Sequence, residues 1–278
     1  MNGTLRFIAA HPLTQNQQSK ARWRFLKWQV VSRFSSDRLV VPWLHGLRLS
    51  VQRGDTGLTG NIYCGLHEFW EMMFALHYLL PGDLFIDAGA NLGAYSLLAA
   101  GIAGTDVLAV EPIPATYRRL SDNIALNQLD KRITAHQVGL ADQPGTLRFS
   151  NLADSAVNRV VSNGGIEVPV TTLDGLLGDK TPGLVKLDVE GFEEAVLAGA
   201  SNLLDQGCPI LMETLERRDF YLALMGEHGY RPSVYEPFSR QLLPADTITN
   251  NTLFIRDMAH CEDRIRNAKP ISVLGHII

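Results

Sequence analysis

The sequence lacks the long apolar run that a membrane-spanning helix requires. No stretch of about 18 uninterrupted apolar residues occurs in its 278 residues. The apolar segment near the N-terminus, Leu5 to Ala10, is interrupted by Arg6 and is too short for the core of a signal peptide. We therefore expect a cytoplasmic protein without a transmembrane segment.

Cysteine is scarce, and its spacing excludes two further classes of protein. Cys64, Cys208 and Cys261 are far apart and odd in number, which fits neither a disulfide framework nor a cysteine-bound metal. The eight histidines show no ligand spacing either. A nucleophile elbow, G-x-S-x-G, is missing, which weakens a hydrolase interpretation. The sequence predicts free thiols and no resident metal.

Positive charge is confined to one end of the chain. Residues 1–38 carry seven Lys/Arg and one acid, which leaves 18 Lys/Arg against 28 acids in the rest. This acidic body argues against a nucleic-acid partner, which would need a basic face. The basic, aromatic segment 20–38 could lie peripherally on an anionic membrane. We favour a cap helix packed on the body or on a partner subunit in a homo-oligomer, because aromatic residues at helical spacing usually pack.

The segment 83–93, DLFIDAGANLG, carries the most specific local pattern. An apolar strand leads into a glycine-rich turn around Gly89, and a helix follows. The next apolar run ends in Glu111, 24 positions after Asp87. Strand, glycine turn, helix, strand and acid is how α/β proteins bind the ribose of a nucleotide-like cofactor.

The residues of the turn narrow the choice of cofactor. A dinucleotide turn reads G-x-G-x-x-G, and Asn91 stands where its second glycine should be. A phosphate loop would need a lysine after its last glycine, and none follows. The turn is therefore typical of an adenosine cofactor without phosphates, of which S-adenosylmethionine (SAM) is the common one. Gly89 would let the backbone approach the methionyl end, Gly93 would allow close helix–strand packing, and Glu111 could accept both ribose hydroxyls.

The order of apolar runs and turn signals predicts an α/β protein. We expect an N-terminal arm and hairpin extension over 1–65, with the hairpin in 39–65, followed by a domain over 66–278. In that domain about seven strands alternate with helices, which implies a doubly wound, mostly parallel sheet closed by an antiparallel strand near 252–256. Strand 184–189 should feed one helix that continues from Phe192 to Gly207.

Acidic residues gather where these strands end, which is where such sheets bind ligands. Asp188 and Glu190 are two positions apart, so on a strand both would point to the same face. They could deprotonate or orient an acceptor hydroxyl, or hold a divalent cation. Alternatively, Glu190 could cap the helix that begins near Phe192.

Other polar residues could complete a substrate site. Glu213 ends the next strand, and Lys186 lies in a buried strand where it would neutralise a carboxylate. His67 and Glu68 precede the first strand of the domain and could cover the site as a lid. We place His67 third as a candidate base, after Glu190 and Asp188, because a lone histidine is more often structural.

Taken together, these motifs resemble the FkbM family of SAM-dependent methyltransferases. The resemblance spans roughly residues 60–215, and it is carried in order by DLFIDAGANLGAYS, VEPIPATYRRLSDNIALN, LDG, VKLDVEGFEEAVLAGA and ME. It implies the class I methyltransferase (Rossmann-like) fold, with seven strands and the last one antiparallel. It also implies methylation of a hydroxyl oxygen, typically on a sugar or a polyketide-like small molecule.

The resemblance also assigns residues to the cofactor. Those that would bind SAM are Asp87, Gly89, Ala90, Asn91, Gly93, Glu111 and Pro112. The reaction would be an in-line displacement in which an acceptor oxygen attacks the SAM methyl while a carboxylate or histidine takes its proton. Two rivals stay open: a nicotinamide-dependent oxidoreductase, and a module that binds SAM or a glycan without turnover. Methylation of protein or nucleic acid is disfavoured by the acidic body.

Overall fold

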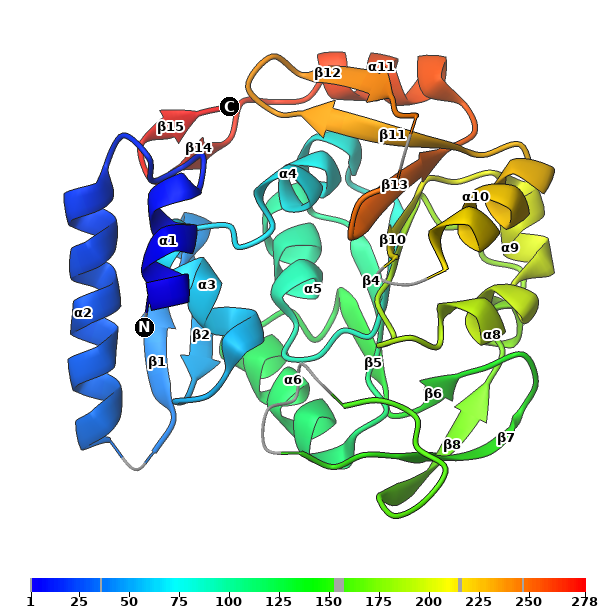
Figure 1. Ribbon diagram of the computed structural model, residues 1–278, viewed down its shortest axis with the longest axis horizontal. Helices are drawn as coiled ribbons and strands as arrows, with labels where there is room; N and C mark the ends of the chain where they lie inside the picture. The colour runs from blue at the N-terminus through cyan, green and yellow to red at the C-terminus, as the bar shows by residue number, and fades with distance from the viewer. Residues whose placement is uncertain (1, 36, 153–157, 215–216, 247) are drawn as a thin grey trace.

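An eight-stranded mixed sheet forms the centre of the protein (Figure 1). The computed structural model describes residues 2–35, 37–152, 158–214, 217–246 and 248–278. The strand order is β12-β11-β13-β10-β9-β3-β4-β5. Its five mutually parallel neighbours are β3 (Leu84–Ala88), β4 (Asp106–Val110), β5 (Ile133–His136), β9 (Leu184–Leu187) and β10 (Ile210–Glu213).

The predicted antiparallel closing strand is present. β13 (Asn251–Ile255) lies between β10 and β11 (Arg231–Glu236) and is antiparallel to both. The prediction of about seven strands is short by one, because β12 (Gln241–Pro244) pairs with β11 at the edge. This short edge strand pairs with one neighbour and ends in proline. Its sequence therefore shows little of the alternating apolar pattern that predicts a strand.

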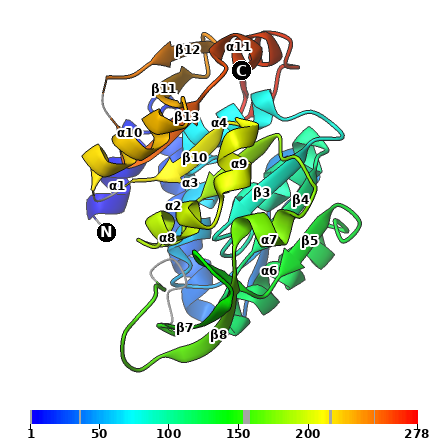
Figure 2. The ribbon, with the colours of Figure 1, turned by 90° about the vertical axis from the view of Figure 1, so that its right-hand side faces the viewer.

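Alternate strand residues feed two cores on opposite faces of the sheet. Phe85 belongs to one core and its neighbour Ile86 to the other, as the two-residue period of a strand requires. The first face is covered by α4 (Phe69–Tyr78), α5 (Ala94–Leu98), η2 (Ala99–Ala103), α6 (Pro114–Leu126) and α11 (Met258–Arg266). The second is covered by α7 (Leu173–Leu177), α8 (Glu193–Ala198), α9 (Ser201–Gln206) and α10 (Arg218–Glu227) (Figure 2).

The prediction of one helix from Phe192 to Gly207 is wrong, because the helix is interrupted between α8 and α9. A Cβ at Gly199 would lie 2.4 Å from the carbonyl oxygen of Ala141, so the glycine permits a close approach to another segment. The Asp174 carboxylate then accepts hydrogen bonds from the backbone N–H groups of Asn202 and Leu203, at 2.9 and 3.0 Å. These bonds satisfy donors at the start of α9.

The N-terminal extension is helical at its start, as predicted. Its elements are α1 (Asn2–Ala10), α2 (Gln18–Phe34), β1 (Leu39–Pro42), η1 (Leu44–Gly46), β2 (Arg48–Val51) and α3 (Thr56–Cys64). The hairpin predicted within 39–65 is present as the antiparallel pair of β1 and β2; it ends at Val51, and α3 follows. A Cβ at Gly60 would lie 2.5 Å from the His67 ring, so this glycine serves helix packing rather than a turn.

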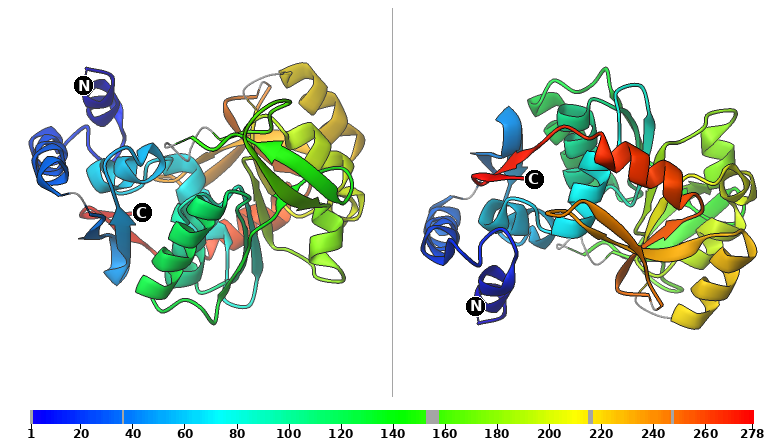
Figure 3. Two further views of the ribbon diagram at one scale, coloured as in Figure 1. Left: turned by 90° about the horizontal axis from the view of Figure 1, so that it is seen from below. Right: turned by 90° about the horizontal axis from the view of Figure 1, so that it is seen from above.

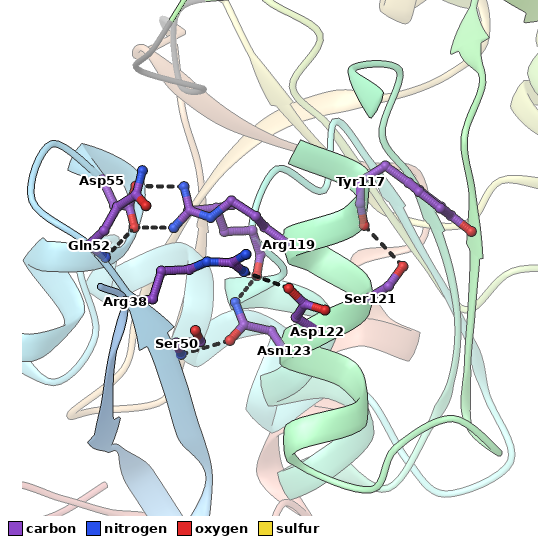
Figure 4. Close-up of polar contacts among 10 residues, drawn as sticks. Arg38, Ser50, Gln52, Asp55, Tyr117, Arg119, Ser121, Asp122 and Asn123 are labelled. Carbon is purple, nitrogen blue, oxygen red and sulfur yellow. Dashed lines mark hydrogen bonds and ion pairs between the residues drawn. The ribbon is translucent and has the colours of Figure 1, made fainter. Parts of the chain in front are cut away.

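Polar contacts attach the extension to α6 (Figure 4). Arg119 forms a two-pronged ion pair with Asp55, with one N–O distance of 2.8 Å, and both side chains are nearly buried. The Asn123 side chain accepts from the backbone N–H of Ser50 at 2.8 Å and donates to the carbonyl of Leu92 at 2.9 Å. Asn123 therefore joins β2 to the glycine turn. The predicted division at residue 65 stays a prediction.

A smaller sheet lies beside the carboxyl end of β5 (Figure 2). It has the order β6-β8-β7, with β6 (Gly139–Leu140), β7 (Gly145–Phe149) and β8 (Ile166–Thr171). β7 and β8 are antiparallel, and β6 is parallel to β8. The chain ends in a short pair, β14 (Ser272–Val273) and β15 (His276–Ile277). Among the described residues, the helices are all too short or too polar to span a bilayer.

Candidate active site

A cavity of about 290 Å³ lies at the carboxyl ends of the parallel strands. The chain leaves β3 for β4 and β5 on one side and returns to β9 and β10 on the other, so this is the topological switch point of the sheet. The residues predicted from the sequence that line the cavity are His67, Glu68, Asp87, Gly89, Ala90, Asn91, Glu111, Pro112, Asp188, Glu190 and Glu213. Gly93 supports the turn from below, where a Cβ would lie 2.6 Å from Leu120.

Gly89 is required by the close approach of two strand ends. Its φ is +82°, and a Cβ there would lie 1.7 Å from the carbonyl oxygen of Asp188. The N–H groups of Gly89 and Ala90 both donate to the carbonyl of Val110, at 3.0 and 2.9 Å. The turn is thus held against β4 and β9 together, with its backbone facing the cavity.

Glu111 lies beside the turn and is 6% exposed. Its carboxylate accepts from the backbone N–H of Asn91 at 3.0 Å and from that of Ile113 at 2.9 Å. Burial raises the pKa of Glu111 to about 8, although the two backbone bonds act in the opposite direction. A carboxylate has about four acceptor positions, so two remain for a diol in the cavity.

A buried lysine balances the carboxylates at the centre of the site. The ammonium of Lys186 lies 2.6 Å from Asp188 Oδ2 and 4.9 Å from the centre of the Tyr95 ring. Burial would lower the pKa of Lys186, but Asp188 and Asp87 outweigh it and the pKa is raised. Asp87 itself accepts from the N–H and hydroxyl of Ser96 at 3.0 and 2.6 Å. Lys186 therefore stays charged between two acids, as its position in a buried strand predicts.

Glu68 is anchored by two residues that sequence reasoning missed. Tyr95 donates its hydroxyl to Glu68 at 2.7 Å, and the Asn251 amide donates to the other oxygen at 3.3 Å. Tyr95 follows the glycine turn directly, so its place in the motif could have indicated it. Asn251 begins the closing strand, and only the topology brings it to this edge.

His67 is fixed by packing. Its backbone N–H donates to the Asn61 side chain at 2.8 Å, and its ring lies edge-to-face with Phe7, with centroids 5.0 Å apart. Burial lowers the pKa of His67, so the imidazole is neutral near pH 7. This neutral ring could accept a proton, and it also closes the wall between the cavity and α1.

Three of the carboxylates that line the cavity converge on one another. Asp188, Glu190 and Glu213 can place one oxygen each within 4.8 Å of one another. Burial and the neighbouring Asp188 raise the pKa of Glu190 to about 7 and that of Glu213 to about 8. Such a set can share a proton, take one from a substrate, or hold a divalent cation through oxygen ligands.

The helix-cap alternative for Glu190 is wrong, because the N-cap position of α8 is Phe192, which has no side-chain cap bond. Glu193 accepts from the backbone N–H groups of Val189 and Gly191 at 3.1 and 3.2 Å. The predicted strand 184–189 ends at Leu187, so the two-residue period does not carry through to Glu190. Glu190 instead has a left-handed φ of 53°. That uncommon conformation brings its side chain to the cavity beside Asp188.

Comparison with known proteins identifies the family. The family described as "Methyltransferase FkbM domain" matches residues 87–254, more than half of the chain. The hexuronic acid methyltransferase AglP of Haloferax volcanii is 29% identical over 136 residues, which cover 47% of this chain and 55% of the relative. Methyltransferase sdnD of Sordaria araneosa is 36% identical over 122 residues, which cover 40% and 46%.

A third relative is the 31-O-demethyl-FK506 methyltransferase FkbM of Streptomyces tacrolimicus, which is 26% identical over 162 residues, or 45% of this chain and 62% of the relative. The chain spans about half the length of the first two relatives. The class I methyltransferase fold implied by the sequence motifs is confirmed. The chain belongs to the FkbM methyltransferase family.

Proposed function

We propose that this protein is a SAM-dependent O-methyltransferase acting on a hydroxyl of a sugar or polyketide-like small molecule. The observation that carries the proposal is one cavity that collects the glycine turn, Glu111 and the three converging carboxylates. The glycine turn fits the methionyl end of SAM, and Glu111 fits its ribose. The three carboxylates give a proton acceptor in the same cavity.

The residues present fit SAM in two ways. The Gly89 turn presents backbone without a side chain, which leaves room for the methionyl end to pass close to β3. Glu111 has acceptor capacity left for the ribose hydroxyls after its two backbone bonds. When bound, the sulfonium of SAM supplies an activated methyl group, so the protein's main task is alignment, which can contribute about 7–11 kcal/mol.

Glu190 is the best candidate for the general base. Its pKa of about 7 leaves it ionised in a useful fraction near neutral pH, where a base works best. Asp188 is held by Lys186 at 2.6 Å, so it would orient the acceptor rather than take its proton. His67, neutral and in the wall next to α1, is the remaining candidate. Glu68 and Glu213 would bind the acceptor through their oxygens.

The acceptor class is proposed from the relatives together with the site. Two relatives are named for a hexuronic acid and for a demethylated FK506, which both offer oxygen acceptors. A cavity edged by carboxylates suits a neutral polyol, whose hydroxyls donate hydrogen bonds to it. It disfavours the phosphate backbone of a nucleic acid, as the acidic body also does.

Ligand-induced stabilisation tests the cofactor. We expect SAM and S-adenosylhomocysteine to raise the melting temperature, because a ligand that binds the folded state stabilises it by mass action. A ligand concentration of about 100 times the Kd should add about 2.7 kcal/mol to the free energy of unfolding. NAD should have no effect, because Asn91 stands where a dinucleotide turn needs glycine. Stabilisation by NAD alone would favour the oxidoreductase. SAM binding without release of S-adenosylhomocysteine, across a panel of polyol acceptors, would favour the non-catalytic module.

The affinity for S-adenosylhomocysteine should depend on pH through Glu111. Its ionised form accepts the ribose hydroxyls, and its pKa in the ligand-free protein is about 8. The affinity should therefore be full above about pH 8 and fall, by up to about tenfold per pH unit, as the pH is lowered below that value. Calorimetric titration across this range measures the effect. Glu111→Gln should bind weakly and without this pH dependence, whereas Glu213→Gln should keep it. A flat profile for the unmodified protein would contradict the assignment.

A further inference from the structure

The outer face of helix α2 is apolar where a surface helix is normally polar. Trp23, Leu26, Val30 and Phe34 are 61%, 58%, 54% and 89% exposed. At 3.6 residues per turn these four side chains fall within an arc of about 80°. The arc lies opposite the residues that α2 buries, which are Ala21, Phe25, Trp28 and Ser32.

Basic residues border this apolar arc on both sides. Arg22 and Arg33 flank one side, Lys20 and Lys27 flank the other, and all four are exposed. Helix α2 is described in full, and its sequence contains no acidic residue. The Lys27 ammonium lies over the Trp23 ring, 5.3 Å from its centre. We call these eight residues together the α2 outer face.

The helix is held rigidly, so its outer face has a fixed direction. The Arg24 guanidinium donates to the carbonyl of Tyr63 in α3 at 2.9 and 2.7 Å. The Phe25 and Tyr63 rings meet edge-to-face with centroids 5.3 Å apart, and Trp28 is buried. The packing alternative for the segment 20–38 therefore holds for Phe25 and Trp28. Trp23 and Phe34 point the other way.

We propose that the α2 outer face binds an anionic phospholipid surface. An apolar arc bordered by Lys and Arg is the pattern of a helix that lies in a membrane interface, with its rings among the acyl chains and its cations at the phosphates. α2 is the outermost element on its side of the molecule, so a flat surface can reach it (Figures 1 and 3). A second copy is disfavoured, because a two-fold contact would bring the basic borders of both helices together.

Vesicle flotation tests the proposal with the full chain. The probes are vesicles of phosphatidylcholine alone and vesicles in which about one-third of the lipid is phosphatidylglycerol. We expect the protein to float with the anionic vesicles and to stay at the bottom with the neutral ones. Binding should weaken from about 0.1 M to about 1 M salt, as the screening length falls from about 10 Å to about 3 Å.

Paired variants separate the two contributions. Leu26→Ser with Val30→Ser should weaken binding at least about tenfold by removing apolar contact. Arg22→Gln with Lys27→Gln should weaken it about 30-fold on anionic vesicles, at about fivefold per charge. The matched control is Val234→Ser with Leu243→Ser, an exposed aliphatic pair on β11 and β12 that should bind unchanged.

Several outcomes would overturn the proposal. They are no flotation with anionic vesicles, equal flotation with neutral vesicles, or equal loss in the control pair. Sedimentation velocity supplies an independent reading: a dimer that Leu26→Ser with Val30→Ser converts to a monomer, without a change in flotation, would assign the face to a second copy. All variants replace exposed side chains, so their folding and S-adenosylhomocysteine binding should match the unmodified protein.

Discussion

Gly89→Ala is expected to remove cofactor binding and to destabilise the fold. The new Cβ would lie 1.7 Å from the carbonyl oxygen of Asp188, whereas ordinary contact begins at 3.4 Å, so β3 and the segment after β9 must separate by about 1.7 Å. Overpacking of this kind and the left-handed φ should together cost about 2–5 kcal/mol of the free energy of unfolding. A shift of this size at the reacting centre should also lower turnover at least about 100-fold.

Gly82→Ala is the matched control for Gly89→Ala. Gly82 has a φ of +95°, so it has the same backbone strain, but a Cβ there would meet nothing within 4 Å. It should cost about 1–3 kcal/mol of stability through strain and leave S-adenosylhomocysteine binding unchanged. Urea unfolding and calorimetric titration measure both properties. If both variants lose the same stability and both bind the ligand, the close approach of Gly89 to Asp188 has no special role.

The glycine turn was predictable because its information is local. Gly89, Asn91 and Glu111 occupy positions set by one strand–turn–helix unit and the next strand, so spacing alone indicates a nucleoside site. The parallel sheet follows from the same local alternation, and it brings distant carboxylates such as Asp188 and Glu213 to one edge. These parts of the site agree with the sequence because one topology determines all of them.

The parts that sequence reasoning missed depend on contacts between distant segments. Gly60 is a turn signal in the sequence, yet it lies inside α3. Glycine is needed at this position because the His67 ring occupies the space that a Cβ would take. Gly199 divides a predicted helix because Ala141, from another segment, lies against it. Glu190 suited a helix cap by its position, and only the structure shows that it lines the cavity beside Asp188 instead.

Glu190→Gln is expected to lower kcat about 10²–10⁴-fold with little change in S-adenosylhomocysteine affinity, because an amide cannot take the acceptor's proton. The unmodified enzyme should gain activity as the pH rises through about 7, where Glu190 ionises, and Glu190→Gln should lose this rise.

Glu213→Gln should shift the rise in activity to lower pH, because removing a neighbouring negative charge favours ionised Glu190. Glu194→Gln, which breaks only an exposed ion pair with Arg217, is the matched control and should behave like the unmodified enzyme. Full turnover in both Glu190→Gln and Asp188→Asn would leave the base to His67.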